Sequence, residues 1–398
     1  MIKAYSVRSY AIAAVFVLSS QGALAFPTFK DHVVNPEAEV VYAVDVADLN
    51  GDKKLDIIGV SATYVAWYEN PTWAPHRIVN QLRNDNVCIA SHDLDGDGVV
   101  ELAIGADWQP NNTKGGGALY LLKHNGDPAS EWSLTTLRES IPTLHRMRWA
   151  DVDGDSKEEL IVSPLKGVDS HPPDFADKPA RLITLYPPAD FAKEPWREEV
   201  IDESLHVCHN IRPTRKSNET RDSILAASFE GITLFTRGSS GGWTKNSLAQ
   251  GNYEPIPRAG AGEIKITVSE PQLMATIEPW HANQVVVYSY SKGEWQRNVL
   301  DDSFAGGHAV YWGDFDGDGD EDLIAGHREK SPKSGMPGLY AYENAGDGAW
   351  KRHAVDEGGM ATEDAIVADI NGDGKPDVVA GGRSTHNIKY YEDLGESK

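Results

Sequence analysis

The segment from Asp314 to Asp322, DFDGDGDED, carries the most specific chemistry in this sequence. Side-chain oxygens occur at its first, third, fifth and ninth positions, and Asp320 supplies a backbone carbonyl at the seventh. Gly317 and Gly319 allow the backbone to turn tightly around these groups. Because Ca²⁺ prefers about six to eight oxygen ligands of this kind, the loop is predicted to bind calcium.

The same frame occurs five times in the chain, and each copy is followed at once by an apolar run such as DIIGV or ELIVS. Solvated acidic turns are the alternative explanation, but chance repetition at such regular places is improbable. The sequence therefore predicts about five Ca²⁺ sites within a structural repeat. The predicted ligands are Asp48, Asn50, Asp52 and Asp56; Asp93, Asp95, Asp97 and Glu101; Asp151, Asp153, Asp155 and Glu159; Asp314, Asp316, Asp318 and Asp322; and Asp369, Asn371, Asp373 and Asp377.

Strand-like segments must position these loops. Seven alternating apolar runs carry aromatic residues near their ends, and six of them are followed by a tryptophan that opens a short amphipathic segment. The missing seventh copy stands at the N-terminus, where Phe29 to Val34 matches Trp350 to Val355. The repeats predict an all-β protein, a seven-bladed β-propeller whose N-terminal strand closes the last blade. The expected boundaries are a signal peptide over residues 1–25 and one propeller over residues 26–398.

Residues 1–25 have the composition of a secretory signal, with Lys3 and Arg8 before an apolar run that is too short to span a bilayer. We expect a secreted product, periplasmic or extracellular, with no membrane insertion. The net charge of −23 argues against nucleic acid and anionic membranes as partners. Cys88 and Cys208 lie in non-neighbouring repeats, which favours two buried thiols over a disulfide.

Residues before the inner strand and after the second strand of each blade are expected to meet on the face opposite the calcium loops. Imidazoles exchange protons near neutral pH, guanidinium groups pair with carboxylates, and indole rings stack on sugars. Such a face suits a carbohydrate-processing pocket, and a divalent metal among its histidines is left open. The candidate residues are His145, His206, His281 and His308; Arg148, Arg212 and Arg328; and Trp108, Lys166, Glu278 and Trp280.

Each candidate also has a structural explanation. A single histidine at the start of a strand is more often a hydrogen-bonded structural residue than a catalyst, and Arg148 can equally balance the charge of a calcium loop. His145, His206 and His308 are favoured as functional residues because three repeats are interpreted as placing histidine at the same distance ahead of the loop position.

The loops resemble the FG-GAP/VCBS calcium-binding propeller repeats, which also build the integrin α-chain head, through the motif Dx(D/N)GDxxx(D/E). The segments LHRMRWADVDGD, VCHNIRP, ATIEPWHANQVVVY and GGHAVYWGDFDGDGDEDLIAGHR further resemble the propeller of aldos-2-ulose dehydratases and, more loosely, rhamnose-glucuronate lyases. This resemblance implies β-elimination on a sugar. It implies that the four histidines act as base or acid, that the three arginines hold a carboxylate or enolate, and that Trp280 is a stacking platform.

Three functions stay open at this stage. The chain is a secreted sugar lyase or dehydratase, a non-catalytic glycan- or protein-binding propeller, or an inert scaffold stiffened by calcium. The number of histidines and arginines on one face favours the first function over the third. A sugar or polysaccharide is the expected ligand, and the sequence does not determine the oligomeric state.

Overall fold

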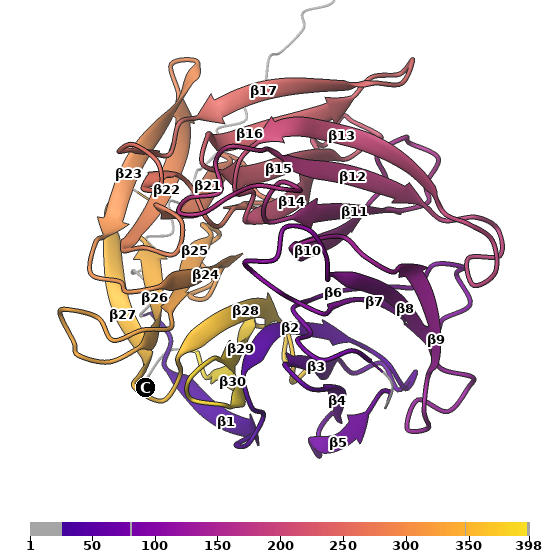
Figure 1. Ribbon diagram of the computed structural model, residues 1–398. Helices are drawn as coiled ribbons and strands as arrows, with labels where there is room; N and C mark the ends of the chain where they lie inside the picture. Colours follow the sequence, from indigo (N-terminus) through magenta and orange to yellow (C-terminus); the bar gives the residue numbers. More distant parts are fainter. Residues whose placement is uncertain (1–25, 80–81, 347, 396–398) are drawn as a thin grey trace, which may run out of the picture.

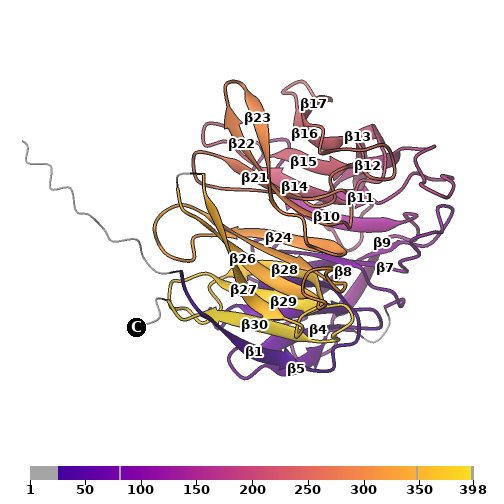
Figure 2. The same ribbon diagram turned by 90° about the vertical axis from the view of Figure 1, so that its left-hand side faces the viewer.

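The computed structural model describes residues 26–79, 82–346 and 348–395. These segments form seven four-stranded antiparallel sheets, arranged around a central axis as the blades of a propeller (Figure 1, Figure 2). The predicted fold class is thereby confirmed. The predicted signal peptide lies outside the described residues. Within the described part of the chain, no helix has the length and apolar character that crossing a membrane requires.

Each blade runs from an inner strand near the axis to an outer strand at the rim. The first four blades are β2 (Val41–Ala47), β3 (Asp56–Ser61), β4 (Val65–Glu69) and β5 (Ala74–Arg77); β6 (Cys88–His92), β7 (Glu101–Ala106), β8 (Ala118–Lys123) and β9 (Ser133–Arg138); β10 (Leu144–Ala150), β11 (Glu159–Pro164), β12 (Ala180–Tyr186) and β13 (Arg197–Leu205); and β14 (Asn210–Thr214), β15 (Ser223–Ser228), β16 (Gly231–Arg237) and β17 (Trp243–Ala249).

A short hairpin of β18 (Asn252–Tyr253) and β19 (Ala259–Gly260) then leads into the remaining blades. These are β20 (Lys265–Ile266), β21 (Leu273–Glu278), β22 (Gln284–Ser291) and β23 (Glu294–Asp301); β24 (Gly307–Gly313), β25 (Asp322–His327), β26 (Gly338–Asn344) and β27 (Trp350–Glu357); and β28 (Thr362–Ala368), β29 (Asp377–Gly382), β30 (Ile388–Asp393) and β1 (Phe29–Asn35).

The first strand of the chain closes the ring. β1 pairs antiparallel with β30, from Phe29 opposite Asp393 to Asn35 opposite Ile388, and Figure 1 shows the indigo β1 beside the yellow β30. The His32 imidazole stacks on the Tyr390 ring at a centroid distance of 4.4 Å. The start of the chain thereby completes the last blade, as the sequence predicts. Without β1, the outer edge of β30 would be unpaired.

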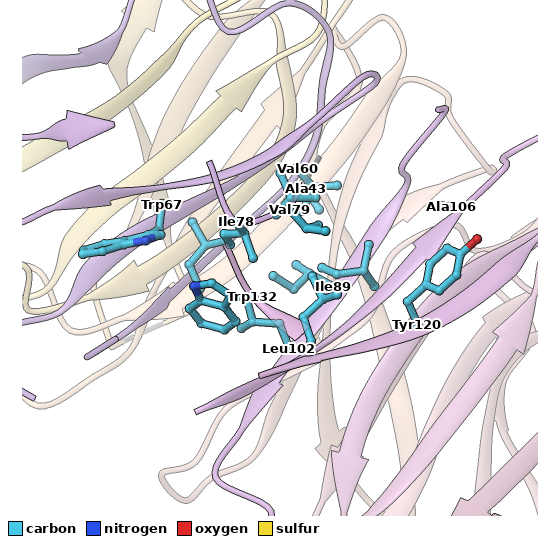
Figure 3. Packing of buried hydrophobic residues seen from close by; sticks show 14 of the residues in the cluster. Ala43, Val60, Trp67, Ile78, Val79, Ile89, Leu102, Ala106, Tyr120 and Trp132 are labelled. Carbon is cyan, nitrogen blue, oxygen red and sulfur yellow. The ribbon is translucent and has the colours of Figure 1, made fainter. Parts of the chain in front are cut away.

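The hydrophobic core lies between the blades. The second strand of every blade with a predicted calcium loop is buried on both faces, which explains its continuous apolar sequence. Seven clusters of buried side chains each join two neighbouring blades, and one of them joins the last blade to the first. Figure 3 shows the cluster between the first two blades, with Val60 and Trp67 facing Ile89, Leu102 and Trp132.

Cys88 and Cys208 are both buried and free, as predicted. Burial raises the pKa of each thiol to about 12, so both are protonated at neutral pH. These cysteines therefore serve as small apolar side chains of the core.

The strand order separates two kinds of chemistry. The predicted calcium loops connect inner to second strands, whereas the start of each inner strand and the end of each second strand lie at the opposite end of the blade. The inner strands of the seven sheets lie around the axis, as the labelled β2, β6, β10 and β14 show in Figure 1. Side chains from seven blades therefore converge at that end of the axis.

Candidate functional site

Three histidines occupy equivalent places at the start of three inner strands. His145 lies at a bulge of β10 just before Arg146, which pairs with Ser163, and His308 lies at a bulge of β24 just before Ala309, which pairs with Gly326. His209 directly precedes Asn210, which pairs with Ala227 at the matching position of β15. All three side chains are buried.

The backbone of the next blade orients each of these rings. His145 Nδ1 donates to the carbonyl oxygen of His209 at 3.0 Å, and His209 Nδ1 donates to that of Gly262 at 2.7 Å. His308 Nδ1 donates to the carbonyl oxygen of Glu363. Because a carbonyl only accepts, the hydrogen is on Nδ1 in each neutral ring and Nε2 keeps its lone pair. The His145 lone pair faces Arg146 Nη1 at 3.4 Å, whereas no hydrogen bond to His308 Nε2 is found among the described residues.

His281, which follows β21, completes the cluster. Its Nδ1 accepts from Arg328 Nη2 at 3.2 Å, since a guanidinium has only donors. Its Nε2 lies 2.7 Å from His209 Nε2 and therefore donates to it. Its ring centroid lies 4.7 Å from that of His308. Arg328, His281 and His209 thus form a chain of hydrogen bonds that fixes the orientation of both imidazole rings.

Two buried carboxylates balance the arginines beside this cluster. Glu363 accepts both Arg328 Nη1 bonds, at 3.0 and 2.9 Å, and a bond of 2.8 Å from Arg383. Glu263 lies 3.1 Å from His209 Nδ1 and 3.9 Å from Arg146. Burial by itself raises the pKa of Glu263, but the contacts with His209 and Arg146 outweigh it, so the pKa is lowered overall. Glu263 is therefore ionised at neutral pH.

The histidines are neutral under the same conditions. Burial, together with the charges of nearby arginines and histidines, holds the pKa of His145, His281 and His308 well below its usual value. Burial also lowers the pKa of His209 against the opposing effect of Glu263. Neutral imidazoles can accept a proton or ligate a metal, whereas imidazolium groups can do neither.

A cavity of about 230 Å³ opens onto the cluster. Trp108 lies beside His145 with a centroid distance of 5.0 Å, and Trp280 lies beside His281 at 4.6 Å. Lys166 also lines the cavity, donating to the carbonyl oxygen of Pro110 at 2.6 Å, and burial lowers its pKa to about 8. The cavity thus combines two indole faces with an ammonium group and several imidazoles, a combination that suits a sugar.

The structure brings most of the predicted candidates to this cavity. His145, His281, His308, Arg328, Trp108, Lys166 and Trp280 all line it. His206 does not; it is half-buried and paired with Glu230, whose Oε1 lies 2.7 Å from its Nδ1. Arg148 and Arg212 line a separate cavity on the axis.

Glu278 also lies elsewhere, inside the fifth blade. It is fully buried and accepts hydrogen bonds from Tyr288, Thr276 and Arg297 at 2.6, 2.8 and 2.8 Å. These three bonds orient both carboxylate oxygens toward the blade interior, so Glu278 contacts neither the imidazoles nor the cavity.

His209 and Glu363 lie at the centre of this site but are not among the candidate residues predicted from the sequence. In blades with a calcium-type loop, the position six residues before the first loop aspartate carries His145, His308 and, in the last blade, Glu363. That spacing signals Glu363. The fourth blade has no such loop, so its register shows only in the strand pairing, which selects His209 instead of His206.

Three of the histidines fit a metal ion. One ring nitrogen from each of His209, His281 and His308 lies within 4.8 Å of the others. Three imidazoles are a common ligand set for zinc, with a further position left for water or substrate. Ligation by His281 Nε2 requires its proton to leave and Arg328 to release Nδ1, so metal binding competes with the hydrogen-bond chain described above.

Four of the five acidic loops share one hydrogen-bonding pattern, and the loop from Asp314 to Asp322 lacks only the bond to Asp314 Oδ1. In the first loop, the Asp48 carboxylate accepts from Gly51 and Lys53, both at 2.8 Å, while buried Asp56 accepts from Leu49 at 3.0 Å. The last loop repeats this pattern from Asp369 to Asp377. The loops are therefore folded into one conformation by their own carboxylates.

Crowded carboxylates in these loops suit a divalent cation. In three of the loops, acidic oxygens from three residues lie within 4.8 Å of one another. Burial and adjacent carboxylates raise the pKa of Asp322 and Glu159 to about 8. In the second loop, the Lys123 ammonium lies 2.6 Å from Glu101 and supplies part of the missing positive charge.

Comparisons with known proteins agree with this architecture. Residues 116–292 match a family model described as the β-propeller domain of aldos-2-ulose dehydratase, and residues 48–104 match one described as an FG-GAP-like repeat. No curated protein sequence matches the chain significantly.

A solved structure with the same fold is the extracellular domain of BT4673 from B. thetaiotaomicron, a protein described as a one-component system. It has a TM-score of 0.52 and 13% sequence identity, over 92% of this chain. This chain spans only 40% of the length of that structure. At this identity the likeness concerns the fold alone.

Proposed function

We propose that this protein is a secreted, calcium-stabilised propeller that acts as a carbohydrate lyase or dehydratase by β-elimination. The observation that carries the proposal is the group of buried, neutral imidazoles held by the backbone of the next blade, with unprotonated Nε2 atoms on His145 and His308, beside a cavity lined by two tryptophans. The match of residues 116–292 to a dehydratase propeller supports the same reaction class.

In such a reaction a base removes the proton next to a carbonyl or carboxylate, and the electron pair forms an enolate. The bond from the β-carbon to oxygen then breaks, and the departing oxygen takes a proton, which gives an unsaturated sugar and water or an alcohol. His145 and His308 are assigned as the base candidates because neither accepts the proton of His281. The imidazolium formed on that base can then donate its proton to the departing oxygen, while His281, whose Nε2 proton is donated to His209, is assigned to positioning Arg328.

Cationic groups at the cavity are assigned to the developing negative charge. Lys166 and Arg328 line the cavity, and Lys166 makes no ion pair with the described residues. A divalent metal held by His209, His281 and His308 would polarise a carbonyl or carboxylate oxygen of the substrate. Both arrangements place positive charge where an enolate needs it.

Calcium and secretion complete the proposal. The raised pKa of the loop carboxylates, caused by burial and mutual repulsion, supports cation binding in these loops. Secretion is supported by the sequence of residues 1–25. The extracellular space and the periplasm both offer calcium and polysaccharides.

A non-catalytic glycan-binding propeller is the second candidate. It is favoured by the double contact of Glu363 with Arg328 and by its contact with Arg383, because these arginines are already paired before any substrate carboxylate arrives. Under this alternative the two tryptophans bind sugar rings and no bond breaks.

The deciding experiment incubates the calcium-loaded protein with uronate-containing oligosaccharides and with anhydrofructose, and follows ultraviolet absorption of the unsaturated product. We expect turnover in the wild type and a loss of at least about a hundredfold in His308→Ala and His145→Ala. His206→Ala is the matched control, because this histidine lies outside the cavity and is paired with Glu230. It should keep activity.

The measurement separates the candidates. Saturable sugar binding without product establishes the binding propeller and rejects the lyase. Equal loss in His206→Ala and His308→Ala indicates a structural effect instead of a catalytic one, which a parallel thermal melt of each variant reveals.

A further inference from the structure

A second cavity of about 260 Å³ lies on the propeller axis. Its walls come from all seven inner strands, including Asp45 of β2, Ser91 of β6, Arg212 of β14, Tyr311 of β24 and Asp364 of β28. Arg146 is the one residue that lines both this cavity and the histidine cavity. The axis therefore holds two chambers with different linings.

Cationic side chains dominate the second chamber. Arg146, Arg148, Arg212 and Lys265 all line it. Arg212 lies 5.8 Å and Lys265 5.5 Å from the centroid of the Tyr311 ring, so both charged groups gather at the same wall. Lys265 is buried, with 6% of its surface exposed.

Arg146 lies 3.9 Å from Glu263, whereas the other three cations have no such carboxylate partner among the described residues. Arg148 donates only to the carbonyl oxygen of Met147, at 2.6 Å, and within the described part of the chain Arg148, Arg212 and Lys265 form no ion pair. Burying a charged group without a partner is strongly unfavourable. Lys265 is buried in this way and Arg148 and Arg212 are half-buried, so an acceptor in direct contact with them would stabilise the folded protein.

The acidic residues of the chamber are held by other donors. Asp45 accepts from the Ser91 hydroxyl at 2.7 Å, and Asp364 accepts from the backbone nitrogens of Val44 and Ala365 at 3.1 and 3.0 Å. Glu158, which also lines the chamber, lies 3.5 Å from His92. Burial raises the pKa of Asp45 and of Asp364 although the nearby arginines act in the opposite direction, so these carboxyl groups offset the positive charge of the chamber only in part.

We propose that the second chamber binds a small inorganic oxyanion of the size and charge of sulfate or phosphate, held by Arg148, Arg212 and Lys265. Guanidinium groups bind tetrahedral oxyanions through two parallel hydrogen bonds, and an ammonium adds a point charge. The geometry of a chamber surrounded by several donors suits such an anion better than it suits a neutral sugar.

Two further observations agree with this assignment. Each water occupies about 30 Å³ in the liquid, so a chamber of about 260 Å³ has room for a tetrahedral anion with a few waters. Burial is the main cause that lowers the pKa of Lys265 to about 7, with Arg148 and Arg212 acting in the same direction. A bound anion offsets that effect and keeps the lysine charged.

Thermal unfolding with sodium sulfate tests the proposal. Sulfate is preferable to phosphate because phosphate precipitates the calcium that the loops are proposed to bind. At millimolar sulfate, fixed calcium and ionic strength matched with sodium chloride, we expect Tm to rise and saturate, since general salt effects on folding require far higher concentrations. Lys265→Met and Arg212→Met should each lose most of this rise.

Arg258→Met is the matched control, because this exposed arginine pairs only with Glu254, at 2.6 Å. It should keep the full sulfate response. A rise that is equal in Lys265→Met and in the control overturns the proposal, as does the absence of any saturable rise. Stabilisation by glucuronate but not by sulfate assigns the chamber to a sugar carboxylate and also rejects the inorganic anion.

Crystals soaked in selenate provide a readout that does not depend on variant stability. The anomalous signal of selenium should lie in the second chamber, with selenate oxygens within hydrogen-bond distance of Arg148 or Arg212, and a signal confined to the outer surface rejects the site. Sugar turnover does not enter either test, so failure of the anion site and failure of the lyase proposal are distinguishable.

Discussion

Near pH 8, Asp322→Asn is expected to lower the stability of this propeller when calcium is bound, and to leave it equal or raise it when calcium is removed. Asp322 is fully buried at the ninth position of the fourth acidic loop, where its carboxylate accepts from Phe315 and Asn344 at 3.1 and 2.8 Å. Burial, followed by the charges of Asp316 and Asp318, raises its pKa from the usual 3.8 to about 8. Without calcium, the folded protein therefore prefers this group protonated.

The sign follows from proton linkage. A carboxyl group with a raised pKa in the folded state contributes stability below its unfolded pKa and loses that contribution as the pH rises through its folded pKa. The window for Asp322 thus runs from about pH 4 to about pH 8. Each pKa unit corresponds to about 1.4 kcal/mol, which gives an upper bound of about 6 kcal/mol for this group. We expect roughly half of that, because the loop can relax and admit water.

The assay compares wild type with Asp322→Asn by urea unfolding, monitored by tryptophan fluorescence, with chelator and with calcium. In chelator, the variant should be less stable than wild type near pH 4 and should equal or exceed it near pH 8. With calcium, wild type should be the more stable protein near pH 8, because its carboxylate is neutralised by the ion. The exposed Asp302→Asn serves as control and should show no crossover.

Two outcomes refute the reasoning. If the difference between wild type and Asp322→Asn is independent of pH in chelator, then Asp322 is not destabilised as a buried anion. If chelator leaves the unfolding curve of the wild type unchanged near pH 8, then the acidic loops are not calcium sites.

Two further predictions concern ring closure and the second loop. Deleting residues 29–35 removes β1, exposes the edge of β30 and takes the stacking partner from Tyr390. We expect the truncated protein to aggregate in light scattering or to lose its cooperative unfolding in calorimetry. An equally stable monomer would contradict this prediction. Lys123→Met removes the ammonium that lies 2.6 Å from Glu101. In calorimetric titration, one site of the variant should therefore bind calcium more tightly than in the wild type. Unchanged affinities would show that Lys123 does not compete with the ion.

The sequence by itself determined the architecture of this protein. The acidic loops and the apolar runs that follow them are local patterns of a strand and its turn, so their spacing predicts the blades, and the match of Phe29 to Trp350 predicts the closing strand. The same local spacing correctly identified the starts of two inner strands that carry His145 and His308, because each lies six residues before a loop aspartate.

Only the tertiary structure decided which side chains share a chamber. The fourth blade lacks the loop that marks its register, so the pairing of Asn210 with Ala227 was needed to select His209 over His206. Arg148 lies three residues after His145, yet it faces a different chamber, and Glu278 is held by its own blade. The physical reason is that spacing along one strand is local, whereas the meeting of side chains at the axis depends on the register of seven strands that are distant in the chain.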